Sequence, residues 1–552
     1  MTSNDNETYL GFDLSTQKLK AVQLDANLQV LVQAEVKFDT DLQEFRTNGG
    51  VNNVTNTAEF YVKPTMWVKA LDIVLDRLVV QGAELSTVVA VSGSAQQHGS
   101  LYWSSYGIKT LSELDADKFL HTQIDDSAFT ITRTPIWMDG STEKQCIEME
   151  EAIGGREKMV EYTGSKCYAR FTGPQIRKIY QTRSDSYENT KRISLVSSFL
   201  ASLFLGQVAP IDYSDGSGMN LLDITKKCWS QPCLNSCAPD LEERLGEPVP
   251  TNSVIGEIGS FFVQRYSFNP RCKIVCFTGD NPSALAGLLV AKNMLAMSLG
   301  TSDTIMMALD APTKMEEGHV LVHPTDDGYM GLLCFRNGSL TRDLFKRVEG
   351  NDSWEYFSEL LDSTPRGNFG NMALHYPQQE IIPQVKGSLR WNKLSNSSDP
   401  ELAKGVSKFS SPQTEIRALI EGQMIHHKSI ASDMGFSFGE DTKILTTGGG
   451  SENKSILQVA SDVFNAPVYT QKSSEAAVLG AAFRAKYVHY ITENKNDEKE
   501  SYFEYTSKFL PHHMQRICDP SVDSAGIYSV MQQRYLEMVH VLQDIVAKNN
   551  NK

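Results

Sequence analysis

Several features are absent from this chain of 552 residues, and each absence excludes a class of protein. No apolar run approaches the roughly eighteen residues that a membrane-spanning helix needs. The nine cysteines are scattered, without the paired spacings of a disulfide framework or a structural zinc site. Asp and Glu (67) outnumber Lys and Arg (52), and the net charge of −15 predicts no basic surface for nucleic acid or an anionic membrane.

The first residues also lack the pattern of a secretory signal. Residues 1–8 are polar, with neither a basic start nor an apolar middle. Together with the reduced thiols, this favours a soluble cytoplasmic protein, and nothing in the sequence indicates an obligate protein partner. What is present is a globular composition, 41% hydrophobic and 22% charged, in a chain too long for one core. We therefore expect two domains.

Short apolar segments of strand character repeatedly lead into small polar turns that contain glycine. Helical periodicity follows the last two of them, a pattern typical of an α/β fold. In α/β sheets ligands bind beyond the strand ends, so we expect the chemistry at these turns. The segments are residues 9–12 before Asp13, 88–91 before Ser92, 274–277 before Thr278, and 444–445 before Thr446.

The sequence contains a faint internal duplication. Residues 11–25 can be aligned with residues 297–310 so that Leu14 matches Leu299, and both segments predict a strand, a hydroxyl-rich turn and a second strand. Such turns direct backbone N–H groups and hydroxyls at one point, where they can bind a phosphate. Each copy opens one half of the chain, as two related domains would, although chance also produces matches of this length.

Asp13 lies at the rim of the first of these turns. A carboxylate there repels phosphate unless a divalent cation, most often Mg²⁺, lies between them. Lys18 or Lys20 could add a positive charge. The turn therefore predicts a site for nucleotide phosphates and Mg²⁺, with a plain β-hairpin as the alternative.

A strand-to-helix junction at residues 277–287 carries a second carboxylate. Pro282 suits the first turn of a helix, so Asp280 or Asn281 is expected at the N-cap. The positive end of the helix would keep Asp280 ionised and able to accept the proton of a substrate hydroxyl. The alternative is that Asp280 only caps the helix.

Three further clusters could bind a substrate or a nucleotide. Residues 92–100 combine amides and hydroxyls with His98, a set of neutral donors and acceptors suited to sugar hydroxyls, although a single histidine is more often structural. Arg170 follows aromatic residues in a loop and is either a substrate contact or a surface side chain stacked on Phe171. Residues 448–450 could seat an adenine, but they do not continue into a Rossmann motif.

Other segments predict structure without chemistry. Residues 104–134 and 363–413 lack a sustained period and are expected to be surface excursions. Residues 492–500 form a charged run typical of a linker, and residues 527–545 have the periodicity of an amphipathic helix that packs on the body of the protein. A coiled-coil partner for this helix is the alternative.

Taken together, the motifs resemble the FGGY carbohydrate kinases of the actin-like ATPase superfamily, and within them the eukaryotic-type D-xylulose kinases. The resemblance covers residues from about 9 to about 487, with the motifs in the family's order. They are Gly11–Gln17, Glu44–Thr47, Gln96–Ser100, Trp137–Asp139, Arg170–Gly173, Ile211–Gly218, Thr278–Pro282, Ser298–Asp303 and Thr447–Gly449.

This resemblance implies an α/β fold of two ribonuclease-H-like (actin-like ATPase) domains that flank an active-site cleft. It implies a sugar-binding N-terminal domain at 1–278 and a nucleotide-binding C-terminal domain at 279–490, followed by a linker and terminal helix at 491–552. The implied reaction transfers the γ-phosphoryl group of MgATP to O5 of D-xylulose.

The resemblance also implies roles for individual residues, position by position. Asp280 matches the catalytic base, Asp13 matches the metal-side carboxylate, and Ser15 stands where most of the superfamily has glycine. The C-terminal signature is only loosely recognisable around residues 420–423, so the second domain matches less closely. The implied sugar contacts are His98, Arg170, Asp280 and Asn281, and the implied nucleotide contacts are Ser15, Thr16, Thr301, Trp354, Gly449, Gly450 and Asn453.

Two other functions stay open at this point. A nucleotide-gated binding protein such as actin or an Hsp70 chaperone shares the phosphate turns, but it does not need the polar cluster at residues 92–100 or Arg170. A second FGGY kinase, acting on glycerol, gluconate or ribulose, would share all of these features. The sugar itself therefore depends on the resemblance alone.

Overall fold

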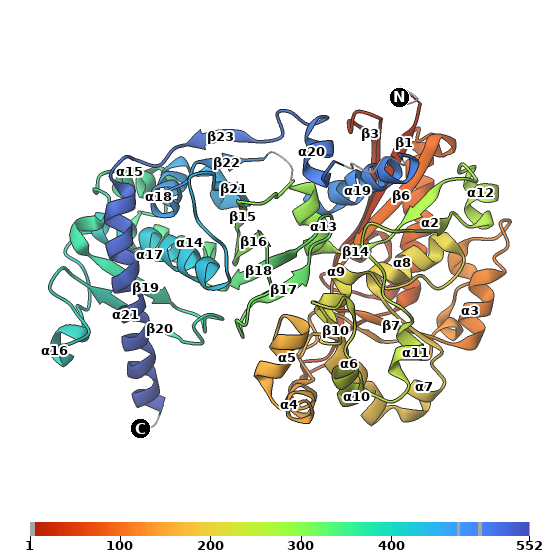
Figure 1. The fold of residues 1–552 in the computed structure, drawn as a ribbon, viewed down its shortest axis with the longest axis horizontal. Coiled ribbons are helices and arrows are strands. Elements are labelled where there is room, and N and C mark those ends of the chain that lie inside the picture. The colour runs from red at the N-terminus through yellow and green to blue at the C-terminus, as the bar shows by residue number, and fades with distance from the viewer. Residues whose placement is uncertain (1–5, 472–474, 495–499, 551–552) are drawn as a thin grey trace. The chain divides into compact units, whose positions relative to one another are not determined.

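The fold was analysed in a computed structural model that describes residues 6–471, 475–494 and 500–550. The chain divides into two compact α/β units (Figure 1). Unit 1 comprises residues 1–289, 319–330 and 475–511, and unit 2 comprises residues 290–318, 331–474 and 512–552. Within the described ranges, none of the helices combines the length and the apolar character needed to cross a bilayer.

Unit 1 is built around a mixed sheet with the strand order β12-β13-β6-β1-β2-β3, in which β14 also pairs with β6. Its strands are β1 (Thr8–Leu14), β2 (Lys18–Leu24), β3 (Val30–Lys37), β4 (Asn52–Asn53), β5 (Phe60–Val62), β6 (Val88–Ala95), β7 (Ser100–Trp103), β8 (Thr134–Pro135), β9 (Arg192–Leu195), β10 (Leu222–Asp223), β11 (Cys228–Trp229), β12 (Val254–Glu257), β13 (Lys273–Val275), β14 (Thr278–Gly279) and β17 (His319–Val322). Its helices are α1 (Phe38–Asp41), α2 (Pro64–Val80), α3 (Ser105–Ser112), α4 (Glu143–Ala152), α5 (Arg156–Thr163), α6 (Thr172–Thr182), α7 (Ser184–Glu188), α8 (Val196–Leu205), α9 (Tyr213–Gly216), α10 (Gln231–Cys237), α11 (Leu241–Leu245), α12 (Ser260–Tyr266), α13 (Asp280–Gly287), α19 (Ala476–Glu493) and α20 (Tyr502–Ser507).

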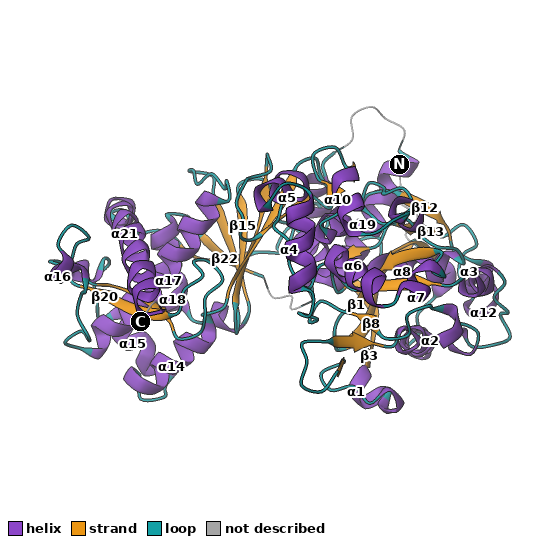
Figure 2. Cartoon of the chain, turned by 90° about the horizontal axis from the view of Figure 1, so that it is seen from below, coloured by secondary structure: helices purple, strands orange, loops and turns teal. Residues whose placement is uncertain are grey.

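The central strand β1 is buried on both faces, and its residues alternate between two cores. Leu10, Phe12 and Leu14 pack with residues of α2 and α8, and Figure 2 shows α8 against the strands. On the opposite face, Tyr9 packs with residues of α19. A Cβ atom on Gly11 would lie 2.5 Å from the backbone oxygen of Val478, so only glycine allows α19 to approach β1 this closely.

The two units do not follow the contiguous ranges 1–278 and 279–490 expected from the sequence. Residues 279–289 and 475–511 belong to unit 1, because α13 and α19 pack on each other and on β1 and β6 (Figure 1). Glycines permit this contact, since a Cβ atom on Gly480 would lie 1.9 Å from the backbone oxygen of Ser283.

Unit 2 repeats the same design with the strand order β18-β16-β15-β21-β22-β23. Its strands are β15 (Met294–Leu299), β16 (Asp303–Leu309), most of β18 (Tyr329–Phe335), β19 (Met372–Tyr376), β20 (Gly387–Trp391), β21 (Lys443–Thr447), β22 (Val468–Thr470) and β23 (Gln515–Cys518). Its helices are α14 (Ser339–Glu349), α15 (Trp354–Asp362), α16 (Pro400–Ala403), α17 (Pro412–Asp433), α18 (Lys454–Phe464) and α21 (Ser524–Asn550).

The duplicated sequence segments form equivalent hairpins in the two units. β1 pairs antiparallel with β2 and parallel with β6, and β15 pairs antiparallel with β16 and parallel with β21. β1 ends at Leu14 and β15 ends at Leu299, which are the residues that the sequence alignment matched. The duplication is therefore present in the structure as well as in the sequence.

The expectation of surface excursions at 104–134 and 363–413 is wrong. The first segment contributes Leu111, Leu120 and Ile124 to the main core of unit 1. The second contains the hairpin β19–β20, in which Leu374 and Trp391 are buried. Both segments are built from elements too short to show a period, so their apolar residues could not be assigned to a face from the sequence.

The C-terminal segment adds a long helix to unit 2. Helix α21 contacts α17 and α18, and its buried side chains Met531, Tyr535, Met538 and Leu542 lie on one face. Residues 495–499 of the expected charged linker lie outside the described residues.

Candidate active site

Two carboxylates meet at the carboxyl ends of the parallel strands of unit 1. Asp13 lies near the end of β1, where its Oδ1 accepts a hydrogen bond of 2.7 Å from Ser94 Oγ on β6. Asp280 follows β14 directly and begins α13. Both side chains are half-buried. This is the end of the sheet where an α/β fold binds its ligands.

Burial makes both of these acids weak. Burial raises the pKa of Asp13 to about 6, although Ser94, Lys20 and Lys18 oppose the rise. Burial and then the charge of Asp13 raise the pKa of Asp280 to about 7. We expected the helix N-terminus to keep Asp280 fully ionised, and that expectation is corrected, since desolvation outweighs the helix dipole here. A pair of this kind favours either a proton or a divalent cation.

The start of α13 also differs from the expected cap. Gly279 is the N-cap residue, and Asp280 is the first residue of the helix, with no side-chain cap bond. Asp280 Oδ1 instead accepts hydrogen bonds from the backbone N (2.8 Å) and the Nδ2 (3.2 Å) of Asn281. The prediction of Asp280 or Asn281 as N-cap is therefore wrong, and the alternative in which Asp280 serves only as a cap is not what the structure shows.

A chain of buried side chains continues from Asn281. Asn281 Nδ2 donates to Gln97 Oε1 (3.0 Å), and Gln97 Nε2 donates to Asp215 Oδ1 (3.4 Å). Ser197 Oγ donates to the other carboxyl oxygen of Asp215 (2.5 Å). Because each amide is fixed by its neighbour, the side chain of Asn281 is held in one orientation. Gln97 and Asp215 fall within the family motifs Gln96–Ser100 and Ile211–Gly218, but no individual role was expected for either residue.

His98 and Arg170, the two unit 1 residues outside α13 that the resemblance implies as sugar contacts, lie close to each other. His98 Nδ1 lies 2.9 Å from the backbone oxygen of Gly218, and since that oxygen only accepts, Nδ1 carries the proton and Nε2 can accept. The ring stacks on Phe171, with centroids 4.2 Å apart. Burial and the charge of Arg170 lower the pKa of His98 to about 3, so the imidazole is neutral. The Arg170 guanidinium lies 4.7 Å from the centroid of the Tyr168 ring.

The turn between β1 and β2 is both a hairpin turn and a possible phosphate contact. Ser15 Oγ donates to the backbone oxygen of Lys18 (3.0 Å), which closes the turn. Thr16 Oγ1 accepts a hydrogen bond of 2.8 Å from Trp137 Nε1. Trp137 is 41% exposed, an unusual state for a tryptophan. Trp137 belongs to the family motif Trp137–Asp139, but no individual role was expected for it.

The other residues expected at the nucleotide, beyond Ser15 and Thr16, lie in unit 2. Thr301 is exposed in the turn between β15 and β16. Gly449 and Gly450 follow β21 in a short 3₁₀ helix, Gly449–Glu452. Asn453 then caps α18 and donates a hydrogen bond of 2.9 Å from its Nδ2 to Ser358 Oγ on α15.

Trp354 belongs to the same part of unit 2. It is the first residue of α15, the helix that Asn453 contacts, and it is 39% exposed. Lys346 Nζ lies 5.3 Å from the centroid of its ring. An exposed aromatic ring is suited to stacking on a flat base.

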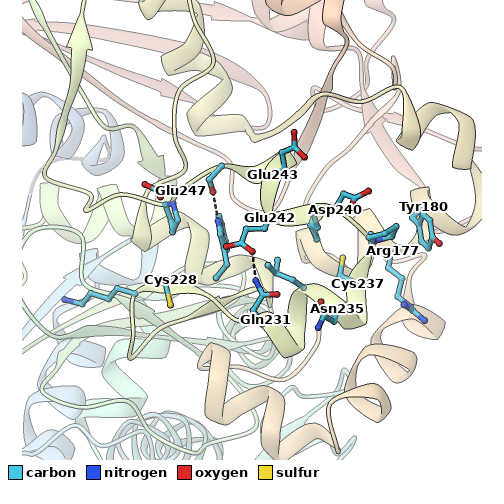
Figure 3. Close-up of a pocket in the computed structure, with 18 of the residues that line it drawn as sticks. Arg177, Tyr180, Cys228, Gln231, Asn235, Cys237, Asp240, Glu242, Glu243 and Glu247 are labelled. Carbon is cyan, nitrogen blue, oxygen red and sulfur yellow. Dashed lines mark hydrogen bonds between the residues drawn. The ribbon is translucent and has the colours of Figure 1, made fainter.

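A large open pocket of about 1170 Å³ lies elsewhere in unit 1 (Figure 3). It is lined mainly by α10, α11 and the loops around them, and it contains none of the residues assigned from the sequence. Among its lining residues, Gln231 Nε2 donates a hydrogen bond of 2.5 Å to Glu242, as drawn in Figure 3.

A solved structure shows the same fold. The crystal structure of xylulose kinase from Rhodospirillum rubrum matches with a TM-score of 0.77 at 14% identity, over 98% of this chain and 100% of that one. The fold is therefore the two-domain, actin-like ATPase fold of the carbohydrate kinases.

The sequence comparisons define the family. The N-terminal and C-terminal domains of the FGGY family of carbohydrate kinases match residues 120–287 and 295–488. Xylulose kinase from Rattus norvegicus is 48% identical over 86% of this chain and 87% of its own length. Xylulose kinase 2 from Arabidopsis thaliana is 43% identical over 86% of each chain. The chain belongs to the FGGY family of carbohydrate kinases, which sets aside the chaperone-like alternative.

Proposed function

We propose that this kinase transfers the γ-phosphoryl group of ATP to O5 of D-xylulose, which gives D-xylulose 5-phosphate and ADP. The observation that carries the reaction is the Asp280 carboxyl, half-buried at the start of α13 beside a second acid. The sugar follows from the similarity to xylulose kinases, which reaches 48% identity over most of the chain. We also propose the cytoplasm as its location.

Asp280 acts as the general base in this proposal. A base is most effective when its pKa lies close to the working pH, and the pKa of Asp280 is about 7. Its carboxylate accepts the proton of the O5 hydroxyl while that oxygen attacks the γ-phosphorus. The backbone N and Nδ2 of Asn281 both donate to Asp280 Oδ1, which fixes the carboxyl plane.

The sugar contacts come from unit 1. Neutral His98 offers Nε2 as an acceptor for a sugar hydroxyl, and Arg170 offers N–H donors to a sugar oxygen. Asn281, held by Gln97, keeps its Oδ1 available for another hydroxyl. Donors and acceptors fixed in advance lose little entropy when the sugar binds.

We assign the proposed nucleotide contacts in each unit by itself. Ser15 and Thr16 are assigned to the phosphates from unit 1. Thr301 is assigned to the phosphates from unit 2, and the adenosine contacts are Trp354, Gly449, Gly450 and Asn453. The exposure of Trp354 and Gly449 supports this assignment.

Asp13 is the proposed metal-side carboxylate for Mg²⁺. Among the described residues no cluster of three or more His, Cys, Asp or Glu side chains is arranged to hold a metal. A single acidic group nevertheless fits Mg²⁺, which keeps several waters and completes its coordination with substrate phosphates. When bound, the cation would neutralise charge on the phosphates. The raised pKa of Asp13, about 6, indicates a carboxyl that a nearby positive charge would stabilise.

A substrate panel tests the proposal. ADP release is measured with D-xylulose, D-ribulose, D-gluconate and glycerol, and the product is identified by ³¹P NMR. We expect D-xylulose to give the highest kcat/KM and a phosphate ester at C5. A preference for another acceptor would overturn the sugar assignment, and the absence of stimulation by any acceptor would overturn the kinase assignment.

The metal assignment has its own experiment. We expect chelation to abolish turnover and added Mg²⁺ to restore it, with a higher half-saturating Mg²⁺ concentration in Asp13→Asn. Asp303→Asn is the matched control, since Asp303 is also an acid next to a hairpin turn but is paired with Arg342. An unchanged Mg²⁺ requirement in Asp13→Asn would remove Asp13 from the metal site.

A further inference from the structure

A histidine from the middle of the chain reaches the sugar site of unit 1. His319 begins β17 and belongs to unit 1, although it falls within the match to the C-terminal family domain. Val320 N donates to the backbone oxygen of Gly164 (3.0 Å), and Val322 N donates to Ser217 Oγ (3.1 Å). These bonds fix β17 between the loop before Arg170 and the end of α9.

The imidazole of His319 contacts the guanidinium of Arg170. Arg170 Nη2 lies 2.7 Å from His319 Nε2. A guanidinium only donates hydrogen bonds, so Nε2 must be the acceptor and the proton of the neutral ring must be on Nδ1. His319 is only 6% exposed. Burial and the charge of Arg170 lower the pKa of His319 well below the ordinary value.

The hydrogen bonding of His319 is directed at Arg170. His319 Nδ1 has no partner among the residues that the structure describes, so the bond to Arg170 is the one its ring makes there. In contrast His323, buried in the same segment, accepts from the backbone N of Asp326 (3.1 Å) and serves its own loop.

Arg170 is thereby held from two sides. Its guanidinium lies 4.7 Å from the centroid of the Tyr168 ring. The Tyr168 ring in turn makes an edge-to-face contact with the His319 ring, with the two centroids 4.7 Å apart. Arginine has a long side chain with many rotamers, and fixing it before the substrate arrives reduces the entropy lost on binding.

We propose that His319 is a positioning residue of the sugar site, which holds the Arg170 guanidinium where it contacts the acceptor sugar. The inference rests on the proposed function, because it gives Arg170 its substrate contact. It adds a residue of the central segment to a site otherwise formed by residues 98, 170, 280 and 281.

The first test compares three substitutions. His319→Leu removes the acceptor, His319→Gln supplies an amide oxygen that can replace Nε2, and His323→Leu is the matched control for loss of a buried histidine. We expect His319→Leu to raise KM for the preferred acceptor about tenfold or more, since a hydrogen bond to a charged group is lost. KM for ATP should change less than twofold. His319→Gln should restore most of the affinity, and His323→Leu should leave both KM values within twofold.

A double-mutant cycle distinguishes positioning from folding. In an Arg170→Met background, adding His319→Leu should change KM for the sugar less than twofold, because the residue through which His319 acts is gone. An unchanged KM in His319→Leu alone would overturn the inference. An equal rise in both backgrounds would also overturn it, since the effect would then not pass through Arg170.

A third measurement does not depend on the substrate. ¹⁵N NMR of histidine-labelled protein, assigned with His319→Gln, should show the Nδ1–H tautomer for His319 and its loss in Arg170→Met. The Nε2–H tautomer in the parent protein would overturn the inference.

If the substrate panel shows an acceptor other than D-xylulose, the sugar assignment fails, and the KM comparisons are made with that acceptor. If no acceptor is phosphorylated, the kinase assignment fails while the tautomer still decides the Arg170 contact.

Discussion

The hairpins β1–β2 and β15–β16 share one topology but use their acidic residues differently. In unit 1, Asp13 lies one residue before the end of β1 and is bonded to the Ser94 hydroxyl. In unit 2, the matching position before Leu299 is Ser298, and the acid is Asp303 at the start of β16. Asp303 is fully buried, with its two oxygens 2.7 and 2.8 Å from nitrogens of Arg342.

This difference separates an acid left for chemistry from an acid used for structure. Burial raises the pKa of Asp303 while the charge of Arg342 opposes that rise, and Arg342 also bonds to Gln423 Oε1 (3.0 Å). The pair therefore connects the second turn to α14 and α17. In unit 1, by contrast, the charge of Asp13 adds to burial in raising the pKa of Asp280, so this pair favours either a proton or a cation.

The largest expected effect tests Asp280, the second acid of the unit 1 pair. We expect Asp280→Ala to lower kcat by about two to four orders of magnitude, because the general base acts in the transition state. ATP binding, measured by calorimetry, should change only a few-fold. Asp303→Asn is the control and should retain far more turnover. Turnover in Asp280→Ala comparable to that of the parent protein would refute the base.

The next effect tests the acid assigned to structure. Arg342→Met leaves the buried Asp303 charge without its partner, which should lower the free energy of unfolding by about 3–5 kcal/mol. Urea unfolding followed by circular dichroism measures this loss. The double variant Arg342→Met with Asp303→Asn should recover part of it. Equal stability of Arg342→Met and the parent would show that the pair does not support the turn.

The pH dependence of kcat/KM sharpens the contrast between Asp280 and Asp303. The base must be deprotonated, and the pKa of Asp280 is about 7, so kcat/KM should fall up to about tenfold per pH unit below about pH 7. Both substrates are kept far below saturation, because this limit reports the free enzyme. Asp303→Asn should keep the same acid limb. A profile that stays flat to pH 5 would contradict the raised pKa of Asp280.

The smallest expected effect concerns the cost of keeping Asp280 in place. A carboxyl whose folded-state pKa is raised loses stability as pH rises from its ordinary range through about 7. A fully buried group would lose roughly 4 kcal/mol, and partial exposure reduces this to about 1–2 kcal/mol. Asp280→Asn should therefore be more stable than the parent at pH 8, and the difference should be clearly smaller at pH 5, because the loss runs from the ordinary pKa of about 4 to about 7. Thermal unfolding at both pH values tests this, and a destabilised Asp280→Asn at pH 8 would contradict it.

Much of the fold could be predicted because its central strands carry local signals. The apolar segment before Asp13 and the matched segment before Leu299 both form strands that end in the expected turns. His98 and Arg170, which the family resemblance pairs as sugar contacts, also lie close enough for the charge of Arg170 to lower the pKa of His98. The residues around Arg170 alone left its role open, so the resemblance supplied that assignment.

The remaining parts depend on contacts that no local pattern encodes. Gln97 bonds to Asn281, 184 residues away, and His319 reaches Arg170 across 149 residues. Gly279 takes the N-cap because β14 continues to the helix start, so the polar residue after it is not needed there. The pKa of Asp280 follows from burial, which the sequence could not supply.

The return of α19 to unit 1 has a consequence for synthesis of the protein. Tyr9, Ala90 and Val275 are buried against this helix, which begins at Ala476, about two hundred residues after β13 and more than four hundred and fifty after β1. While the ribosome is still producing unit 2, one face of the unit 1 sheet leaves its apolar side chains exposed to solvent. The two units therefore cannot mature one after the other from the N-terminus, and a fragment ending at residue 289 would expose that face to aggregation.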